Sequence, residues 1–178
     1  MNDKNKVVQR NQPRLVVYTR HTSQNQLAGY QVNRSIQKLK DECQLAGYNV
    51  TNVYLEESRQ PSYRARPVLK QMLKDAFNGS FEVVMIADAF TLSSDGEERQ
   101  QLEIELAGYN IVLYSESDYI ADSPEEGMRL FEYMRKLINT KHLRLAALQG
   151  ISLSQVARWM IEDDCKGGET IVKPCEKI

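Results

Sequence analysis

Short apolar runs alternate along the chain with segments whose apolar residues have helical spacing. Runs with the spacing of buried or half-buried strands occur at residues 15–19, 49–56, 81–87 and 109–114. Apolar residues at helical spacing fill the intervals between them, at residues 32–43, 67–77 and 96–107. Because strands that alternate with helices form parallel sheets, this order predicts an α/β fold. We expect a mainly parallel four- to five-stranded sheet flanked by helices.

A longer helix is predicted after the last strand. Ser123 offers an N-cap and Pro124 suits the first turn, so the helix is expected to run to about residue 148. Its apolar stripe consists of Met128, Phe131, Met134, Leu137 and Ile138. The stripe either packs on the chain's own sheet or forms the seam of a homodimer. The position of the helix beyond the last strand favours the homodimer.

The chain divides into four predicted segments. Residues 1–13 are polar and end at a proline, which predicts a flexible arm, and residues 14–121 form the α/β domain. The long helix occupies 122–148, and 149–178 are expected to hold a short helix and a flexible tail. Residues 150–157 resemble the start of a helix-turn-helix, but acidic and glycine residues follow instead of a recognition helix. A complete DNA-reading module is therefore not expected.

Composition narrows the classes of function. The net charge of −1 over 178 residues does not support a strongly basic nucleic-acid binder, although a local basic face stays open. The three cysteines lack metal-type spacing and there are only two histidines, so we expect free thiols, no metal and no cofactor. No apolar run approaches the ~20 residues that span a bilayer. The polar N-terminus has no apolar signal core, so we expect a cytoplasmic protein without a membrane partner.

Candidate chemistry gathers where the predicted strands end. Arg20 follows the first strand and is accompanied by two hydroxyl side chains, Thr22 and Ser23. The second and third strands end near Glu56 and Asp88. In parallel sheets the site lies at the carboxyl ends of the strands, so these side chains are expected at one edge. An arginine beside hydroxyls suits a site that holds and attacks a phosphate.

Several motifs, in order along the chain, resemble the N-terminal catalytic domain of the serine recombinases, the resolvase/invertase family. Tyr18, Arg20 and Gln26 match the opening motif of that family. Residues 66–69, Arg-Pro-Val-Leu, match its Arg-Pro-x-Leu motif. Residues 88–94 stand where the family has Asp-Arg-Leu-Ser/Gly-Arg after the third strand. The order and spacing of these motifs together carry the resemblance, because each motif alone is weak.

The resemblance covers roughly residues 14–135 and implies both a fold and a reaction. Members of the family attack a phosphodiester of DNA with a serine hydroxyl and form a covalent phosphoserine link without a metal. Several arginines neutralise the phosphate and the charge that develops in the transition state. The long helix after the domain pairs subunits and approaches the DNA. The catalytic positions that match the family or lie beside it are Arg20, Thr22, Ser23 and Arg66.

This chain departs from the family at the same site. Thr22 stands at the position of the nucleophilic serine, and Ser23 lies one place late. Phe90 replaces the acid of the third motif, while Thr91 and Ser94 replace two arginines. Because the loss of one preorganised donor costs ~10²–10³ in rate, these departures predict a pseudoenzyme that no longer cuts DNA.

We therefore expect a serine-recombinase-like protein associated with DNA recombination and integration. It would act by self-association, by pairing with an active recombinase, or through weak DNA binding. One alternative is an active site-specific recombinase that uses Thr22 or Ser23, and another is a small-anion or nucleotide-binding domain. Ordinary structural roles also stay open, with Arg20 as an ion-pair partner, Arg66 as a helix start and the glutamates of residues 97–105 as a solvated face.

Overall fold

The computed structural model describes residues 12–21, 26–57, 60, 62–87, 89–115, 121–138, 157 and 160–161. Residues 26–30, 89 and 90 are described by their backbone alone. Most of the predicted arm and most of the predicted tail therefore lie outside the described residues. Within the described part of the chain, no helix is both long and apolar enough to cross a membrane.

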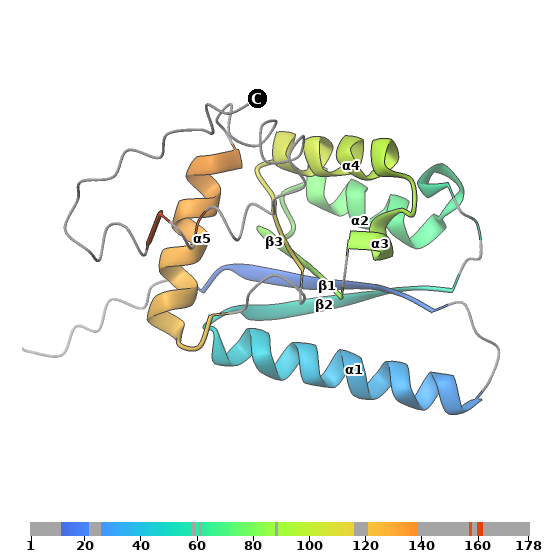
Figure 1. The fold of residues 1–178 in the computed structure, drawn as a ribbon, viewed down its shortest axis with the longest axis horizontal. Coiled ribbons are helices and arrows are strands. Elements are labelled where there is room, and N and C mark those ends of the chain that lie inside the picture. The colour runs from blue at the N-terminus through green and yellow to red at the C-terminus, as the bar shows by residue number, and fades with distance from the viewer. Residues whose placement is uncertain are drawn as a thin grey trace, which may run out of the picture.

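Four parallel strands form the single sheet of the described residues, which confirms the predicted α/β architecture (Figure 1). The strands are β1 (Arg14–Arg20), β2 (Asn49–Glu56), β3 (Val83–Ile86) and β4 (Val112–Ser115). Their order across the sheet is β2-β1-β3-β4, so β1 and β3 lie in the middle. All four residues of β3 are buried, as expected for a strand covered on both faces.

Helices cover both faces of the sheet. The helices are α1 (Gln26–Leu45), α2 (Pro67–Phe77), α3 (Ala89–Leu92), α4 (Gly96–Gly108) and α5 (Pro124–Ile138), with a short 3₁₀ turn η1 (Tyr63–Ala65) before α2. Figure 1 shows α1 on one side of the sheet and α2, α3 and α4 on the other. Side chains along β1 alternate between the two sides, as the pleat requires. Leu15 and Val17 join the apolar cluster of α1 and α5, whereas Val16 and Tyr18 join that of α2 and α4.

Local signals account for most helix ends. Gly47 ends α1 and Gly79 ends α2, and both adopt a positive φ that favours glycine. Asp95 caps α4 because its side chain accepts hydrogen bonds from the backbone of the first turn. At the end of α4 the left-handed residue is Asn110, although Gly108 was the predicted stop. The short helix α3 was not predicted, because its four residues are too few to show a periodic pattern.

The apolar stripe of α5 faces the interior of its own domain. The stripe residues Phe131, Met134, Leu137 and Ile138 are buried in the same cluster as β1, β3 and β4. The chain's own sheet therefore covers most of this stripe, and the homodimer through α5 stays a prediction. Only Met128 of the predicted seam is partly exposed. Residues 139–148 of the predicted long helix lie outside the described residues.

A close backbone contact fixes the start of α5. A Cβ atom at Gly127 would overlap the carbonyl oxygen of Ala46, so only glycine lets α5 approach the end of α1 this closely. The hydroxyl of Tyr48 donates to the Gly127 carbonyl at 3.0 Å and lies 2.9 Å from the hydroxyl of Tyr114. Burial is the main reason that the pKa values of both tyrosines are raised. The pair therefore stays neutral and holds α5 against the sheet.

Candidate functional site

The carboxyl ends of β1 and β2 meet at one edge of the sheet, as the order of the motifs predicted. Arg20, the last residue of β1, is paired in register with Glu56, the last residue of β2. The backbone N–H of His21 donates to the Glu56 carbonyl at 2.8 Å and continues the ladder by one step. We call this region, together with the loops that follow β2 and β3, the carboxyl edge.

Arg66 is the most deeply buried charged side chain at this edge. Its side chain is 0% exposed, although it stands directly before α2. The Nε atom donates to the Gln60 carbonyl at 3.2 Å, and Nη1 donates to the Thr91 carbonyl at 3.2 Å and to the Leu92 carbonyl. The guanidinium thus ties the loop after β2 to α3. A fork of fixed donors suits this task, because it can bond several backbone carbonyls at once.

Arg20 converges on the same place from β1. Its Nη2 atom donates to the Gln60 carbonyl at 2.9 Å, so the two arginines share one backbone acceptor. Arg20 is half-buried, whereas Arg66 is covered. Of the two arginines that match the family motif, Arg20 is the one nearer to solvent. The two side chains therefore lie close together, and their predicted catalytic role stays a prediction.

Glu56 has a role that the sequence pattern did not reveal. Its carboxylate is buried, and Oε2 accepts hydrogen bonds from the backbone of Val68 at 3.0 Å and of Leu69 at 3.2 Å. Helix α2 begins without a side-chain cap from its own N-cap residue. Glu56 supplies that cap from the neighbouring strand, where a negative charge also suits the helix dipole. The sequence signal that could have indicated this role is the start of α2, where Arg66 is not a residue type that usually caps a helix.

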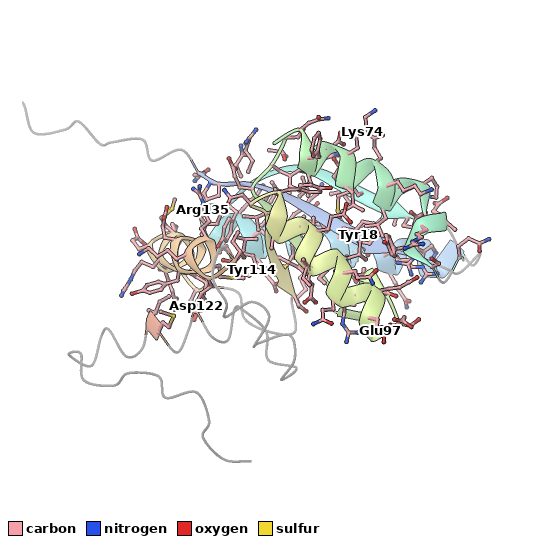
Figure 2. All side chains as sticks on the ribbon, turned by 90° about the horizontal axis from the view of Figure 1, so that it is seen from above. Tyr18, Lys74, Glu97, Tyr114, Asp122 and Arg135 are labelled. Carbon is pink, nitrogen blue, oxygen red and sulfur yellow. The ribbon has the colours of Figure 1, made fainter. Side chains whose placement is uncertain are left out.

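Tyr18 of β1 packs with residues of α2 and α4 (Figure 2). Its buried hydroxyl makes no hydrogen bond of ordinary geometry within the described residues. Burial raises the pKa of this phenol, and the nearby guanidinium of Arg66 opposes the rise. The net direction is upward, so the hydroxyl keeps its proton at neutral pH.

Comparison with known proteins assigns the family. The model of the resolvase N-terminal domain matches residues 15–150. The chain belongs to the resolvase family of serine recombinases. A comparison with curated protein sequences found no match.

Solved structures of serine recombinases share the fold of this chain. The N-terminal catalytic domain of TP901-1 integrase has a TM-score of 0.55 at 17% identity, over 85% of this chain and 98% of that one. The C-terminal catalytic domain of ISC1926 TnpA, an IS607-like serine recombinase, has a TM-score of 0.52 at 18% identity, over 84% and 99%. A resolvase family site-specific recombinase from Streptococcus pneumoniae has a TM-score of 0.52 at 14% identity, over 87% and 97%.

Thr91 and Ser94, which we predicted to stand in place of two family arginines, lie along the rim of the carboxyl edge. Thr91 is half-buried and uses its carbonyl to accept from Arg66, while the side chain of Ser94 is exposed. Between them, Ser93 is buried and its hydroxyl donates to Glu98 at 3.0 Å. Asp88, Thr22 and Ser23 lie outside the described residues, as does the side chain of Phe90. Their predicted positions at the site are therefore not tested.

The rim of the carboxyl edge carries the negatively charged side chain of Glu98. Glu98 of α4 accepts from Ser62 at 2.9 Å and from Ser93 at 3.0 Å, and so joins the loop after β2 to the end of α3. Desolvation acts to raise the pKa of Glu98, but these hydrogen bonds and one from the Tyr63 backbone outweigh it and lower the pKa. The prediction that this glutamate is only part of a solvated face is wrong, because it holds two loops together.

The described residues contain no group of three or more His, Cys, Asp or Glu side chains that could hold a metal ion.

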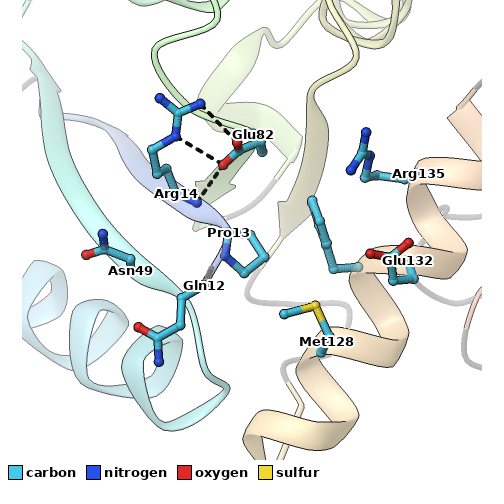
Figure 3. Close-up of a pocket in the computed structure, with 9 residues that line it drawn as sticks. Gln12, Pro13, Arg14, Asn49, Glu82, Met128, Glu132 and Arg135 are labelled. Carbon is cyan, nitrogen blue, oxygen red and sulfur yellow. Dashed lines mark hydrogen bonds and ion pairs between the residues drawn. The ribbon is translucent and has the colours of Figure 1, made fainter. Parts of the chain in front are cut away.

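A groove of about 610 Å³ lies at the opposite end of the sheet (Figure 3). It is lined by Gln12, Pro13, Arg14, Asn49, Glu82, Met128, Phe131, Glu132 and Arg135. An exposed ion pair crosses it, because Arg14 Nη2 lies 2.9 Å from Glu82 Oε1. Arg20 and Arg66, the predicted catalytic residues that the structure describes, do not line this groove, so the groove and the carboxyl edge are separate regions. We call the groove and the start of α5 the amino edge.

Proposed function

We propose that this serine-recombinase-like protein no longer cuts DNA and acts in recombination through association. The observation that carries the proposal is the position of Arg66. Its guanidinium is fully buried and engaged by the carbonyls of Gln60, Thr91 and Leu92. A buried donor that already satisfies three backbone carbonyls would have to leave them before it could hold a phosphate at the surface.

The electrostatics of the rim support the same proposal. Phosphoryl transfer depends on preorganised positive charge around the phosphate, and each donor is worth ~10²–10³ in rate. At this rim the matching positions are Thr91 and Ser94, and the neighbouring carboxylate of Glu98 has a lowered pKa. The hydroxyl groups cannot neutralise a phosphate, and the carboxylate repels it.

Association is then the remaining way for the protein to act. A net charge of −1 makes any DNA binding weak and sensitive to salt. The apolar stripe of α5 is buried in the domain, so pairing with a second copy or with an active recombinase would use other surfaces or would require α5 to move.

The second candidate function is an active recombinase that uses Thr22 or Ser23. Arg20 favours it, because this arginine remains at the end of β1, immediately before both hydroxyls. In that reaction the hydroxyl oxygen would attack the phosphorus and lose its proton. A phosphoester to the protein would form, and the bond to one deoxyribose oxygen would break and release a sugar hydroxyl.

Covalent capture separates the two functions. A nicked duplex that traps the protein–DNA link would be incubated with the chain and separated under denaturing conditions, beside an active serine recombinase as positive control. We expect no covalent adduct from this chain. An adduct that disappears in Thr22→Ala or Ser23→Ala would establish the active enzyme and overturn the proposal.

The association arm is tested by a salt titration. A random duplex is expected to shift only at low salt, because few phosphates are neutralised by a chain of this charge. Binding that persists at physiological salt would contradict weak, nonspecific association. The absence of any shift at low salt would leave protein association as the mode of action.

A further inference from the structure

Helices α2 and α4 lie side by side on the same side of the sheet (Figure 2). Their inward side chains share one apolar cluster. The two helices run in the same direction, because each leads back to the start of a parallel strand, α2 to β3 and α4 to β4. We call the solvent-facing side of these two helices the α2–α4 face.

Large apolar side chains are exposed on the α2–α4 face. Of the three that are exposed in the described part of the chain, two lie here: Phe77 at the end of α2 is 71% exposed, and Ile104 of α4 is 40% exposed. The ring of Phe77 meets that of Tyr109, the C-cap of α4, edge to face at a centroid distance of 5.5 Å. Apolar side chains that gather on a surface indicate an interaction site more strongly than isolated ones.

The two helices carry opposite charges on their outward sides. The exposed charged residues of α2 are Lys70 and Lys74, one turn apart. Asp75 of α2 is half-buried, and its carboxylate accepts from Tyr54 at 2.7 Å. The exposed charged residue of α4 is Glu97, and its half-buried side chains include three further glutamates and one arginine. The α2–α4 face is therefore positive along one helix and negative along the other.

A second copy of this chain is complementary to such a face. Homo-oligomers most often have twofold symmetry, in which both subunits use the same patch. With the twofold axis along the line between α2 and α4, α2 of each subunit lies over α4 of the other in the same direction. The lysines of each copy then face the acidic helix of the other, and Phe77 lies toward the Ile104 side chain of the second copy. One symmetry operation thus pairs both the apolar and the charged groups.

We propose that two copies of this chain pair through the α2–α4 face. A second copy fits both helices, whereas the phosphates of DNA would be repelled by α4 and an acidic protein would suit α2 alone. Pairing here leaves α5 packed on its own sheet. The inference names a partner for the association in the proposed function and rests on that function only for its role in recombination. Because the face exposes few large apolar groups, the dimer is expected to be weak.

Sedimentation velocity of the full chain without DNA tests the pairing. The average mass should rise from that of a monomer toward that of a dimer between about 1 µM and about 500 µM. Phe77→Gln should weaken the dimer by about tenfold or more, because an aromatic anchor is lost. Leu45→Gln is the matched control, since Leu45 is 69% exposed but ends α1 on the other side of the sheet (Figure 1). A monomer at every concentration, or a dimer that Phe77→Gln leaves unchanged, would overturn the proposal.

A charge swap tests the geometry of the pair. One variant, Lys70→Glu with Lys74→Glu, makes the outward sides of both helices negative. The other, Glu97→Lys with Gln101→Lys, makes the outward side of α4 positive beside the lysines of α2. Each variant alone should stay monomeric, because like charges then meet across the pair. An equimolar mixture of the two variants should restore the dimer, because every helix then faces the opposite charge.

The matched control for the swap is Arg34→Glu with Lys38→Glu, which reverses two exposed charges one turn apart on α1 and should pair like the wild type. Circular dichroism should show that all variants are folded, since every substituted side chain is exposed. A mixture that stays monomeric would overturn the twofold arrangement, and so would a dimer that persists in each swapped variant alone. A covalent adduct on nicked DNA would overturn the non-cutting proposal and leave this one standing, because the mass is measured without DNA.

Discussion

The two edges of the same sheet are closed in different ways. At the carboxyl edge, the buried side chains of Arg66 and Glu56 hold the backbone of neighbouring loops and of α2. At the amino edge, Gly127 lets the backbone of α5 touch the end of α1, and the charged pair of Arg14 and Glu82 stays exposed. One edge is held by buried charges with backbone partners, and the other by close steric contact.

The two kinds of contact differ in what they contribute to the stability of the fold. A buried charge that satisfies backbone groups is needed for stability, because its removal leaves those groups without partners. Arg66 therefore has a structural reason to persist even in a protein that does not cut DNA. The exposed pair at the amino edge has no comparable role, since solvent and salt screen it.

The largest effect is expected at the carboxyl edge. Arg66→Met should lower the free energy of unfolding by about 3–5 kcal/mol, because the carbonyls of Gln60, Thr91 and Leu92 lose buried donors. Urea unfolding monitored by circular dichroism measures this change. Arg64→Met is the control, since Arg64 is exposed and should cost little. A loss below 1 kcal/mol for Arg66→Met would contradict the view that buried charges hold the carboxyl edge together.

The strongest effect at the amino edge should come from a single methyl group. Gly127→Ala places a Cβ against the Ala46 carbonyl and should cost about 1–3 kcal/mol, because α5 must move outward. Thermal unfolding provides the measurement. In the control, Gly108→Ala, the added Cβ meets no atom within 4 Å, so the variant should be as stable as the wild type or slightly more stable. Equal behaviour of the two variants would mean that α5 is not seated as described.

A smaller loss is expected when the cap of α2 loses its charge. Glu56→Gln keeps a carbonyl-type acceptor for the backbone of Val68 and Leu69 but removes the interaction with the helix dipole. We expect a loss of about 1 kcal/mol in the free energy of unfolding. Glu57→Gln, one residue later and exposed, should leave stability unchanged. If both substitutions had the same effect, Glu56 would not be the cap.

Breaking the exposed ion pair should matter least. Arg14→Ala is expected to cost at most about 1 kcal/mol, because the two side chains are 44% and 36% exposed. A double-mutant cycle with Glu82→Ala isolates the pairwise contribution. The coupling should shrink further at high salt. A coupling as large as the effect of Arg66→Met would remove the distinction between the two edges.

The same ion pair predicts a small pH dependence. Burial acts to raise the pKa of Glu82, but hydrogen bonds and charge from Arg14 outweigh it, so the folded pKa lies below the usual 4.5. The stability that Glu82 contributes is therefore present above pH ~4.5 and is lost as the pH falls through the lower folded pKa. The stability difference between wild type and Arg14→Ala should shrink as the pH falls from 6 through the lowered folded pKa of Glu82. A stability difference between the two proteins that grows as the pH falls would contradict a lowered pKa of Glu82 in the folded protein.

Local sequence signals predicted most of the fold. They did not predict contacts between residues that are distant in the sequence. The start of α2 at Pro67 and the stop of α1 at Gly47 follow from the backbone preferences of single residues. The cap from Glu56 was not predicted, because the acceptor and the donors of Val68 and Leu69 are brought together only by the fold. The same holds for Arg66, whose partners lie in two separate loops.

The apolar stripe of α5 shows most clearly what sequence periodicity can and cannot predict. Its periodicity predicted that Phe131, Met134 and Ile138 would be buried, which the structure confirms. Periodicity does not distinguish burial against the chain's own sheet from burial against a second subunit. The predicted homodimer seam was a choice between these two possibilities.

By itself, the sequence determined the order of the elements and the family, and it led to the prediction that Thr91 and Ser94 stand in place of two family arginines. These are properties of single positions and short patterns. Tertiary structure alone decided that Arg66 is sealed inside the domain and that α5 packs on its own sheet. Both outcomes depend on how closely distant segments of backbone approach one another, and that distance is set by packing of the whole domain.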